Sequence, residues 1–147
     1  MKSRLTLLTL LLAAAAWAQD GDTDVLTAHD DRGNISTVYN LFDGARHAIQ
    51  VARLSPQGGV HWTLDHSDGY WEKANGAAMG PDGDLYVSGV RRADRLRYFL
   101  SLKFDVGGYL LWETQDNEPG CESVGVVVDS LGNSITAGVC KRGQTFP

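Results

Sequence analysis

The sequence predicts an all-β protein built from a repeated unit of four antiparallel strands. Residues 52–62 return as residues 102–112, with Gly and Trp at matching positions. A turn with Gly recurs three times, and a segment such as residues 99–105 alternates apolar and polar residues with the period of a strand. Self-similarity at this period of 50 residues indicates that neighbouring units cover one another's apolar faces.

The first 18 residues have the pattern of a secretory signal peptide. Two basic residues precede an apolar stretch over residues 5–16, and Ala16-Trp17-Ala18 is an A-x-A cleavage site, so the exported chain is expected to begin at Gln19. The stretch is shorter than the roughly 20 residues that span a bilayer, which disfavours the alternative of an N-terminal anchor. We expect a secreted or periplasmic protein with no later membrane span, in which residues 19–24 form an acidic linker.

The charge of the chain argues against nucleic acid as a partner. The net charge of the 147 residues is −5, and loss of Lys2 and Arg4 with the signal makes the exported chain more acidic. Phosphate binding uses clusters of Lys and Arg. The basic cluster of this chain, over residues 91–97, is interrupted by Asp94 and is interpreted as a solvated loop or edge strand.

Three glycines mark equivalent hairpin turns. Gly33, Gly83 and Gly132 each stand shortly before a β-rich segment, with spacings of 50 and 49 residues. The turn needs a positive φ at this position, which Gly adopts without a Cβ clash, so these glycines are assigned a structural role. The one-residue difference in spacing is assigned to Asn75, as a residue without a counterpart in the third copy.

The turns and the alternation divide the chain into three successive units. We expect the first at residues 25–66, the second with its leading loop at 67–116, and a partial third at 117–147. The expected strands lie at about 25–30, 34–41, 46–54 and 59–65; 76–80, 84–90, 97–105 and 109–115; and 123–129 and 133–140.

Four short strands per unit, Gly turns and a recurrent Trp are typical of a β-propeller blade. The runs at residues 74–78, 83–89, 102–105 and 108–112 resemble the bacterial β-propeller repeat family of secreted proteins, and more distantly the repeats of quinoprotein-like propellers. The resemblance covers about residues 25–140. It implies blades of four antiparallel strands and is nearly silent on activity.

About two and a half blades do not close a propeller, because closed propellers have four to eight. The expectation is therefore an incomplete propeller. Either the chain is a fragment with further blades missing, which we favour, or the closed object is a homo-oligomer, for which a half blade is a poor unit.

Trp62 and Trp112 occupy equivalent positions at the start of the fourth strand of their units. Equivalence between units favours a structural role, in which each indole packs against the adjacent blade and its N–H reaches a partner. The alternative is an aromatic platform for a sugar or a cofactor.

Tyr70, Trp71 and Glu72 are the candidate ligand-binding residues. They are expected in the loop between the first two units, and the next loop has Gly120-Cys121-Glu122 instead, so the repeat does not require these aromatic residues. Exposed aromatic residues beside a carboxylate suit recognition of a carbohydrate or a protein. The alternative is that Trp71 covers the end of a blade.

Cys121 and Cys140 flank the last hairpin and are expected to form a disulfide in an oxidising compartment. A Ser130-Leu131-Gly132 loop places Asp129 opposite Asn133, which leaves the two cysteines one residue from direct opposition. A bulge or a slip in pairing would bring them together. The alternative is two free thiols, and no metal site is expected because two thiols do not complete a zinc site.

These features predict an exported β-propeller repeat protein that acts as a non-catalytic binding or scaffolding module without a cofactor. One alternative is a fragment of a propeller enzyme, such as a quinoprotein-like dehydrogenase or a lyase. Another is a lectin that closes its propeller by self-association.

Overall fold

The computed structural model describes residues 25–42, 44 and 47–141, and these residues form ten strands and no helix. The predicted signal peptide and acidic linker, and residues 142–147, lie outside the described residues. The first sheet contains β1 (Val25–His29), β2 (Ile35–Phe42), β3 (His47–Leu54) and β4 (Val60–His66). The second contains β5 (Trp71–Met79), β6 (Leu85–Ala93), β7 (Leu96–Phe104) and β8 (Leu110–Gln115), and the third contains β9 (Cys121–Val128) and β10 (Ser134–Cys140).

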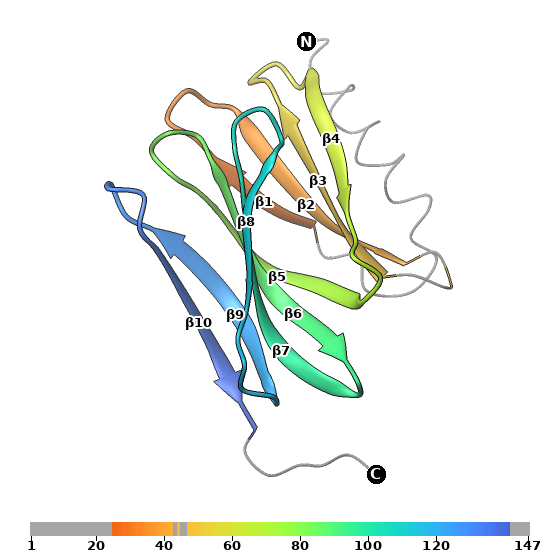
Figure 1. The fold of residues 1–147 in the computed structure, drawn as a ribbon. Coiled ribbons are helices and arrows are strands. Elements are labelled where there is room, and N and C mark those ends of the chain that lie inside the picture. The colour runs from red at the N-terminus through yellow and green to blue at the C-terminus, as the bar shows by residue number, and fades with distance from the viewer. Residues whose placement is uncertain (1–24, 43, 45–46, 142–147) are drawn as a thin grey trace.

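Every neighbouring pair of strands is antiparallel, and each sheet keeps its strands in chain order. Figure 1 shows the sheets following one another in space, from the orange strands of the first to the blue strands of the third. The all-β class and the grouping of strands into four, four and two therefore agree with the sequence-based expectation.

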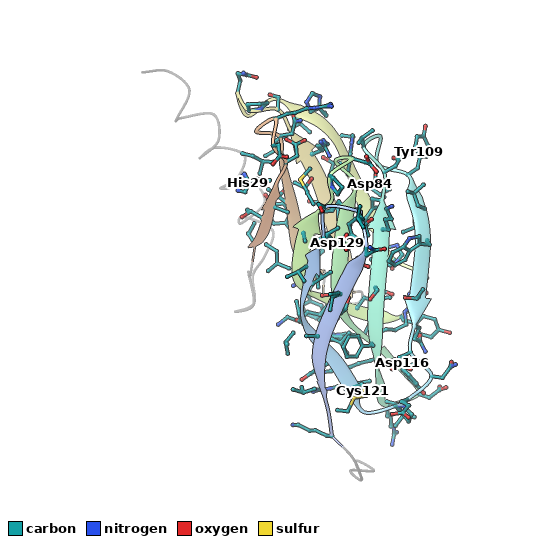
Figure 2. The ribbon with its side chains drawn as sticks, turned by 90° about the vertical axis from the view of Figure 1, so that its left-hand side faces the viewer. His29, Asp84, Tyr109, Asp116, Cys121 and Asp129 are labelled. Atoms are coloured by element: carbon teal, nitrogen blue, oxygen red, sulfur yellow. A yellow bond between two sulfur atoms is a disulfide. The ribbon has the colours of Figure 1, made fainter. Side chains whose placement is uncertain are left out.

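The hairpin turns form as the glycine positions predicted. Gly33, Gly83 and Gly132 have φ angles of 78°, 83° and 82°. A residue with a Cβ would be strained at these positive φ angles. Asp129 shows why the turn is compact, because its Oδ1 accepts the backbone N–H groups of Leu131 and Asn133 at 2.9 and 2.8 Å. Figure 2 shows Asp84, Asp129 and Tyr109 toward one end of the molecule and Cys121 and Asp116 toward the other.

The main apolar core lies between the first and second sheets. It is formed by alternate residues of the strands that face one another, and these residues are almost completely buried because each sheet covers the other. Its largest members are Val38, Ile49, Val51, Leu85, Val87, Leu100, Leu102 and Phe104.

Polar contacts fix how the first sheet meets the second. Trp62 donates its indole N–H to the backbone oxygen of Val106, in the β7–β8 turn, at 2.8 Å. Arg53, 6% exposed, donates to the Gly83 carbonyl at 2.6 Å and forms an ion pair with Asp30 at 2.7 Å. Both side chains reach turns at the same end of the sheets, so they hold the relative position of the two sheets.

The second and third sheets meet through small and polar residues. Ser123 donates its hydroxyl to Ser88 at 2.7 Å with both side chains buried, and Tyr86 donates to the Gly132 carbonyl at 2.9 Å. A Cβ at Gly76 would lie 2.7 Å from the Cα of Gly125, so the backbones approach closely here. This interface is correspondingly less apolar than the first.

The register of the sheets corrects the assignment of Asn75. The pairing of β5 with β6 shifts between Ala74 and Gly76, and the pairing of β9 with β10 shifts at Val124. Asn75 and Val124 are therefore the equivalent extra residues of two β-bulges, and the residue missing from the third copy lies before β9. A bulge keeps a strand paired beyond the extra residue, which is why β5 begins at Trp71 rather than near residue 76.

Candidate functional site

The sequence-predicted site residues begin β5 instead of lying together in a loop. Tyr70 ends the connection from the first sheet, whereas Trp71 and Glu72 pair with Arg92 and Arg91 of β6. Successive side chains of a strand point to opposite faces of the sheet, so Trp71 and Glu72 lie on different faces. Glu72 is 1% exposed, so its carboxylate is buried and does not lie at the surface beside the aromatic residues.

Glu72 belongs to a buried network centred on Arg91. The Arg91 side chain donates from Nε to Glu72 Oε1 at 2.7 Å, and its Nη2 contacts the same oxygen. Nη2 also pairs with Asp68 at 2.7 Å and with Glu113 at 2.5 Å. Interpretation of this arginine as part of a solvated loop is therefore wrong, since the side chain joins the inter-sheet connection to β5 and β8.

His66, at the end of β4, completes this network. Its Nε2 lies 3.4 Å from Glu72 Oε2 and 3.3 Å from Glu113 Oε2. Burial raises the pKa of Glu72 to about 7, and burial lowers the pKa of His66. Among the fully buried side-chain atoms of this network, His66 Nε2 and Glu72 Oε2 have no hydrogen-bond partner, and a proton on Glu72 Oε2 could be donated to His66 Nε2. The network thus holds excess negative charge that favours one bound proton.

The other face of the second sheet presents a row of exposed and half-buried residues. Trp71 pairs with Arg92, and Arg92 pairs with Arg97 of β7, so the three side chains lie side by side across the strands. They line an open hollow of about 470 Å³ between the second and third sheets. Lys73 of β5 and Glu122 of β9 also line it, so three cationic side chains face one carboxylate.

The Arg92 guanidinium lies over an aromatic ring. Its guanidinium carbon lies 3.9 Å from the Trp71 ring centroid, and His47 stands 4.9 Å from the same ring, centroid to centroid. Within the described residues the Arg92 side chain has no hydrogen-bond partner. A guanidinium stacked in this way keeps its in-plane N–H groups available to a carboxylate. Because the indole contacts both Arg92 and His47, Trp71 is placed to orient Arg92.

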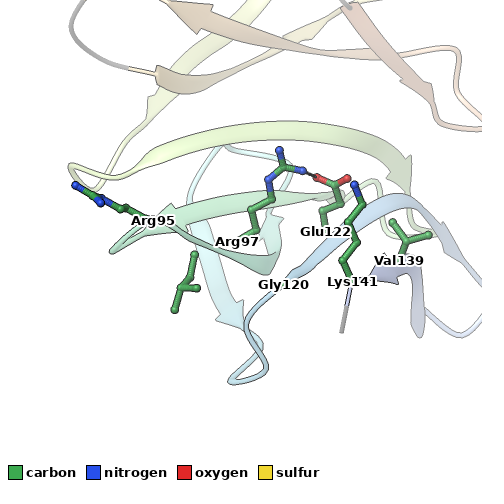
Figure 3. A pocket seen from close by; sticks show the side chains of 7 residues that line it. Arg95, Arg97, Gly120, Glu122, Val139 and Lys141 are labelled. Atoms are coloured by element: carbon green, nitrogen blue, oxygen red, sulfur yellow. Dashed lines mark hydrogen bonds and ion pairs between the residues drawn. The ribbon is translucent and has the colours of Figure 1, made fainter. Parts of the chain in front are cut away.

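Arg92 and Arg97 are like charges directly opposite each other, an arrangement that disfavours the folded chain. Burial lowers the pKa of Arg92, and the nearby Arg97 lowers it further. Glu122 offsets part of this repulsion through its 2.8 Å ion pair with Arg97. Figure 3 shows this pair, with the Lys141 side chain beside Glu122.

Tyr70 stands at the mouth of the buried network. Tyr70 is 48% exposed, and the Arg91 guanidinium carbon lies 5.3 Å from the centroid of its ring. Tyr70 therefore partly covers Arg91, whereas Trp71 contacts Arg92 in the hollow. The sequence proposal that these two aromatic residues contact a ligand stays a prediction.

The two equivalent tryptophans and the two cysteines make contacts that stabilise the fold. The Trp62 indole spans the interface between the first two sheets, and a Cβ at Gly108 would lie 2.9 Å from its ring. Trp112 lies edge to face with Tyr86 at 6.1 Å. Cys121 and Cys140 form a disulfide with Cα atoms 4.0 Å apart, made possible by the Val124 bulge that brings them into register.

The strand pairing of the second and third sheets shows that two pairs of residues are equivalent, although the 50-residue period of the sequence does not align them. Counting 49 residues from β5 and β6, Glu72 corresponds to Cys121 and Arg91 to Cys140. The ion pair of the second sheet and the disulfide of the third therefore occupy the same cross-strand position. Both link the first strand of a sheet to the second near the connection from the preceding sheet.

Among residues 25–42, 44 and 47–141, no group of three His, Cys, Asp or Glu side chains could hold a metal ion. The same residues include no helix that is long and apolar enough to cross a membrane. No family model and no curated protein sequence matches the chain.

Proposed function

We propose that this chain is an exported repeat protein of the β-propeller type that acts as a non-catalytic binding module. Its ligand carries carboxylates and binds in the hollow beside Trp71. The observation that carries the proposal is the arrangement of Arg92, which is stacked on Trp71, opposite Arg97 and without a hydrogen-bond partner among the described residues.

A carboxylate in this hollow relieves the repulsion between the two arginines. Arg92 offers two parallel N–H groups, which match the two oxygens of a carboxylate, and bonds of this kind are among the stronger ones in proteins. Lys73 lines the same hollow and adds positive charge. The site is cationic on a chain whose net charge is −5, so the local charge is not an extension of the general surface.

The propeller architecture is supported by the repeated four-stranded sheets and by Trp62, which crosses to the next sheet. Export is supported by the disulfide, because such bonds persist in oxidising compartments. The buried Glu72 network supports a mainly structural role for the connection that carries Tyr70.

The test is isothermal titration of the purified chain with a trimer of galacturonic acid, at low salt. A neutral galactose trimer and a Glu-rich peptide are measured beside it, to separate sugar recognition from simple carboxylate recognition. We expect the uronate to bind and the neutral trimer not to bind. Arg92→Gln should weaken binding about tenfold or more, since charged hydrogen bonds are each worth about 1.5–3 kcal/mol.

Arg32→Gln is the matched control, because Arg32 lies exposed in the β1–β2 turn and carries the same charge. It should leave binding within twofold of the original chain. If both substitutions weaken binding equally, the loss of affinity comes from the change in net charge and not from a site at Arg92. Binding of the neutral trimer as tightly as the uronate would contradict the carboxylate site.

A further inference from the structure

Glu122 is the only acidic side chain among the described residues that line the hollow beside Trp71. The cationic side chains in this hollow are Lys73, Arg92 and Arg97. A carboxylate inside a site for anions acts against every anion that enters, and it acts most strongly against the most highly charged one. Glu122 therefore bears on which anions bind.

Glu122 already occupies one of the two opposed arginines. Its Oε2 lies 2.8 Å from Arg97 Nη1, and the two side chains are 30% and 34% exposed. Figure 3 shows the Arg97 side chain of β7 and the Glu122 side chain of β9 pointing toward each other. Water competes with an ion pair that is exposed to this extent, so the pair is weak. An anion that enters the hollow binds Arg92 and shares Arg97 with Glu122.

The charge of Glu122 also reaches Arg92. Burial lowers the pKa of Arg92 and the nearby Arg97 lowers it further, whereas Glu122 raises it. Glu122 thus stabilises the charged guanidinium of Arg92, although its own ion pair is with Arg97. An anion bound to Arg92 therefore lies in the electrostatic field of Glu122, and the two negative charges repel each other.

The backbone of β9 holds Glu122 in this place. Cys121, the residue before it, forms the disulfide with Cys140. Ser123, the residue after it, is completely buried and donates its hydroxyl to Ser88 at 2.7 Å. Because both of its neighbours are fixed, Glu122 keeps its carboxylate at the hollow whichever anion binds.

We infer that Glu122 determines which anions bind in the hollow, because it disfavours a phosphate monoester more than a carboxylate. This inference rests on the proposed function of the hollow. A carboxylate has one negative charge and can bind Arg92 alone through both of its oxygens. A phosphate monoester has about two negative charges at pH 8 and binds clusters of basic side chains. Arg92, Arg97 and Lys73 would form such a cluster if Glu122 were neutral.

The size of the effect follows from the charge of the ligand. The repulsion between Glu122 and a bound anion is proportional to the charge of that anion. Removal of the Glu122 charge therefore changes the binding free energy of a dianion by twice as much as that of a monoanion, and the factor in affinity is squared. A gain of about threefold for a carboxylate corresponds to a gain of about tenfold for a phosphate monoester.

The test compares galacturonate with galactose 6-phosphate, which carry different anionic groups at the same carbon of the same sugar. Each is titrated into the isotope-labelled full chain at pH 8 and low salt, where screening is weak, and the backbone amide signals of β6 and β9 are followed by nuclear magnetic resonance. Glu122→Gln should raise the affinity for galacturonate about threefold and that for galactose 6-phosphate about tenfold.

Glu118→Gln is the matched control, because it removes the same charge from an exposed side chain in the connection before β9. It should leave the ratio of the two affinities unchanged. Glu122→Asp keeps the charge and should also keep the ratio. Glu122→Ser removes the charge with a smaller side chain and should change the ratio as Glu122→Gln does. This variant decides the question if circular dichroism shows that Gln disturbs the sheets.

An equal gain for both ligands in Glu122→Gln, or no gain for galactose 6-phosphate, would overturn the inference and leave the carboxylate site in place. A different outcome would contradict the proposed function and support the role of Glu122. In that case the original chain binds neither galacturonate nor its trimer, whereas Glu122→Gln binds galactose 6-phosphate. Absence of binding of every ligand to every chain would overturn both.

Discussion

Replacement of Glu72 by Gln tests how the buried network titrates. The Glu72 carboxyl is fully buried, accepts from Arg91 and lies beside His66, while Asp68 and Glu113 compete for the same guanidinium. Gln has nearly the same shape as a protonated Glu. Its oxygen can accept from Arg91 and its amide can donate to His66 Nε2, so the substitution mimics the protonated state at every pH.

The magnitude follows from the rise in the pKa of Glu72 from 4.5 to about 7. A raised pKa of a carboxyl means that folding favours the protonated form. The contribution to stability is therefore present below pH 4.5 and is lost as the pH rises through 7. The shift corresponds to about 3 kcal/mol at most. Glu72→Gln should match the original chain near pH 4.5 and exceed its unfolding free energy by up to about 3 kcal/mol at pH 8.

The assay is equilibrium urea unfolding at pH 4.5, 6 and 8, followed by tryptophan fluorescence. The lowered pKa of His66 makes stability fall as the pH drops below 6.5. This effect is present in both chains, so the difference between the chains reports mainly Glu72. Exposed Glu118→Gln is the control and should show no difference at any pH. A Glu72→Gln chain that is less stable than the original at pH 8 would refute the reasoning, because the ion pair with Arg91 would then outweigh burial.

Three further variants test contacts within and between the sheets. Cys121→Ser with Cys140→Ser should lower the unfolding free energy by about 3 kcal/mol, because the disulfide closes a loop with a sequence separation of 19 residues; calorimetry with and without reductant checks this. Trp62→Phe should cost about 1 kcal/mol for the lost bond to Val106, measured by urea unfolding, and an unchanged midpoint would contradict the contact. Gly108→Ala should cost roughly 1–3 kcal/mol, since φ is +89° and the new Cβ would meet Trp62; thermal unfolding measures this, and a stability equal to that of the original chain would argue against the turn geometry.

The period of the sequence was sufficient to predict the number of strands and their grouping into sheets, although β5 begins earlier than expected. Gly turns and alternation report local geometry, and in this chain the local signals agree with the sheets that form. The cysteine pair was predictable for the same reason. Its one-residue offset from direct opposition required a bulge, and the bulge is present at Val124.

The surroundings of Trp71 and Glu72 were not predictable from the local pattern. The bulge at Asn75 extends β5 toward the preceding loop and sends these two neighbours to opposite faces. The partners of Glu72 come from β6, β8 and the inter-sheet connection, and no spacing rule joins them. The basic residues at 91–97 appeared to be a solvated run, although strand alternation placed Arg91 inside and Arg92 in the hollow.

The most direct test of the binding proposal is a crystal structure of the chain grown with the galacturonate trimer. We expect a sugar carboxylate within hydrogen-bond distance of the Arg92 guanidinium, close to Arg97, with Arg92 still stacked on Trp71. A trimer bound elsewhere, or an empty hollow at a concentration that saturates binding in solution, would contradict it.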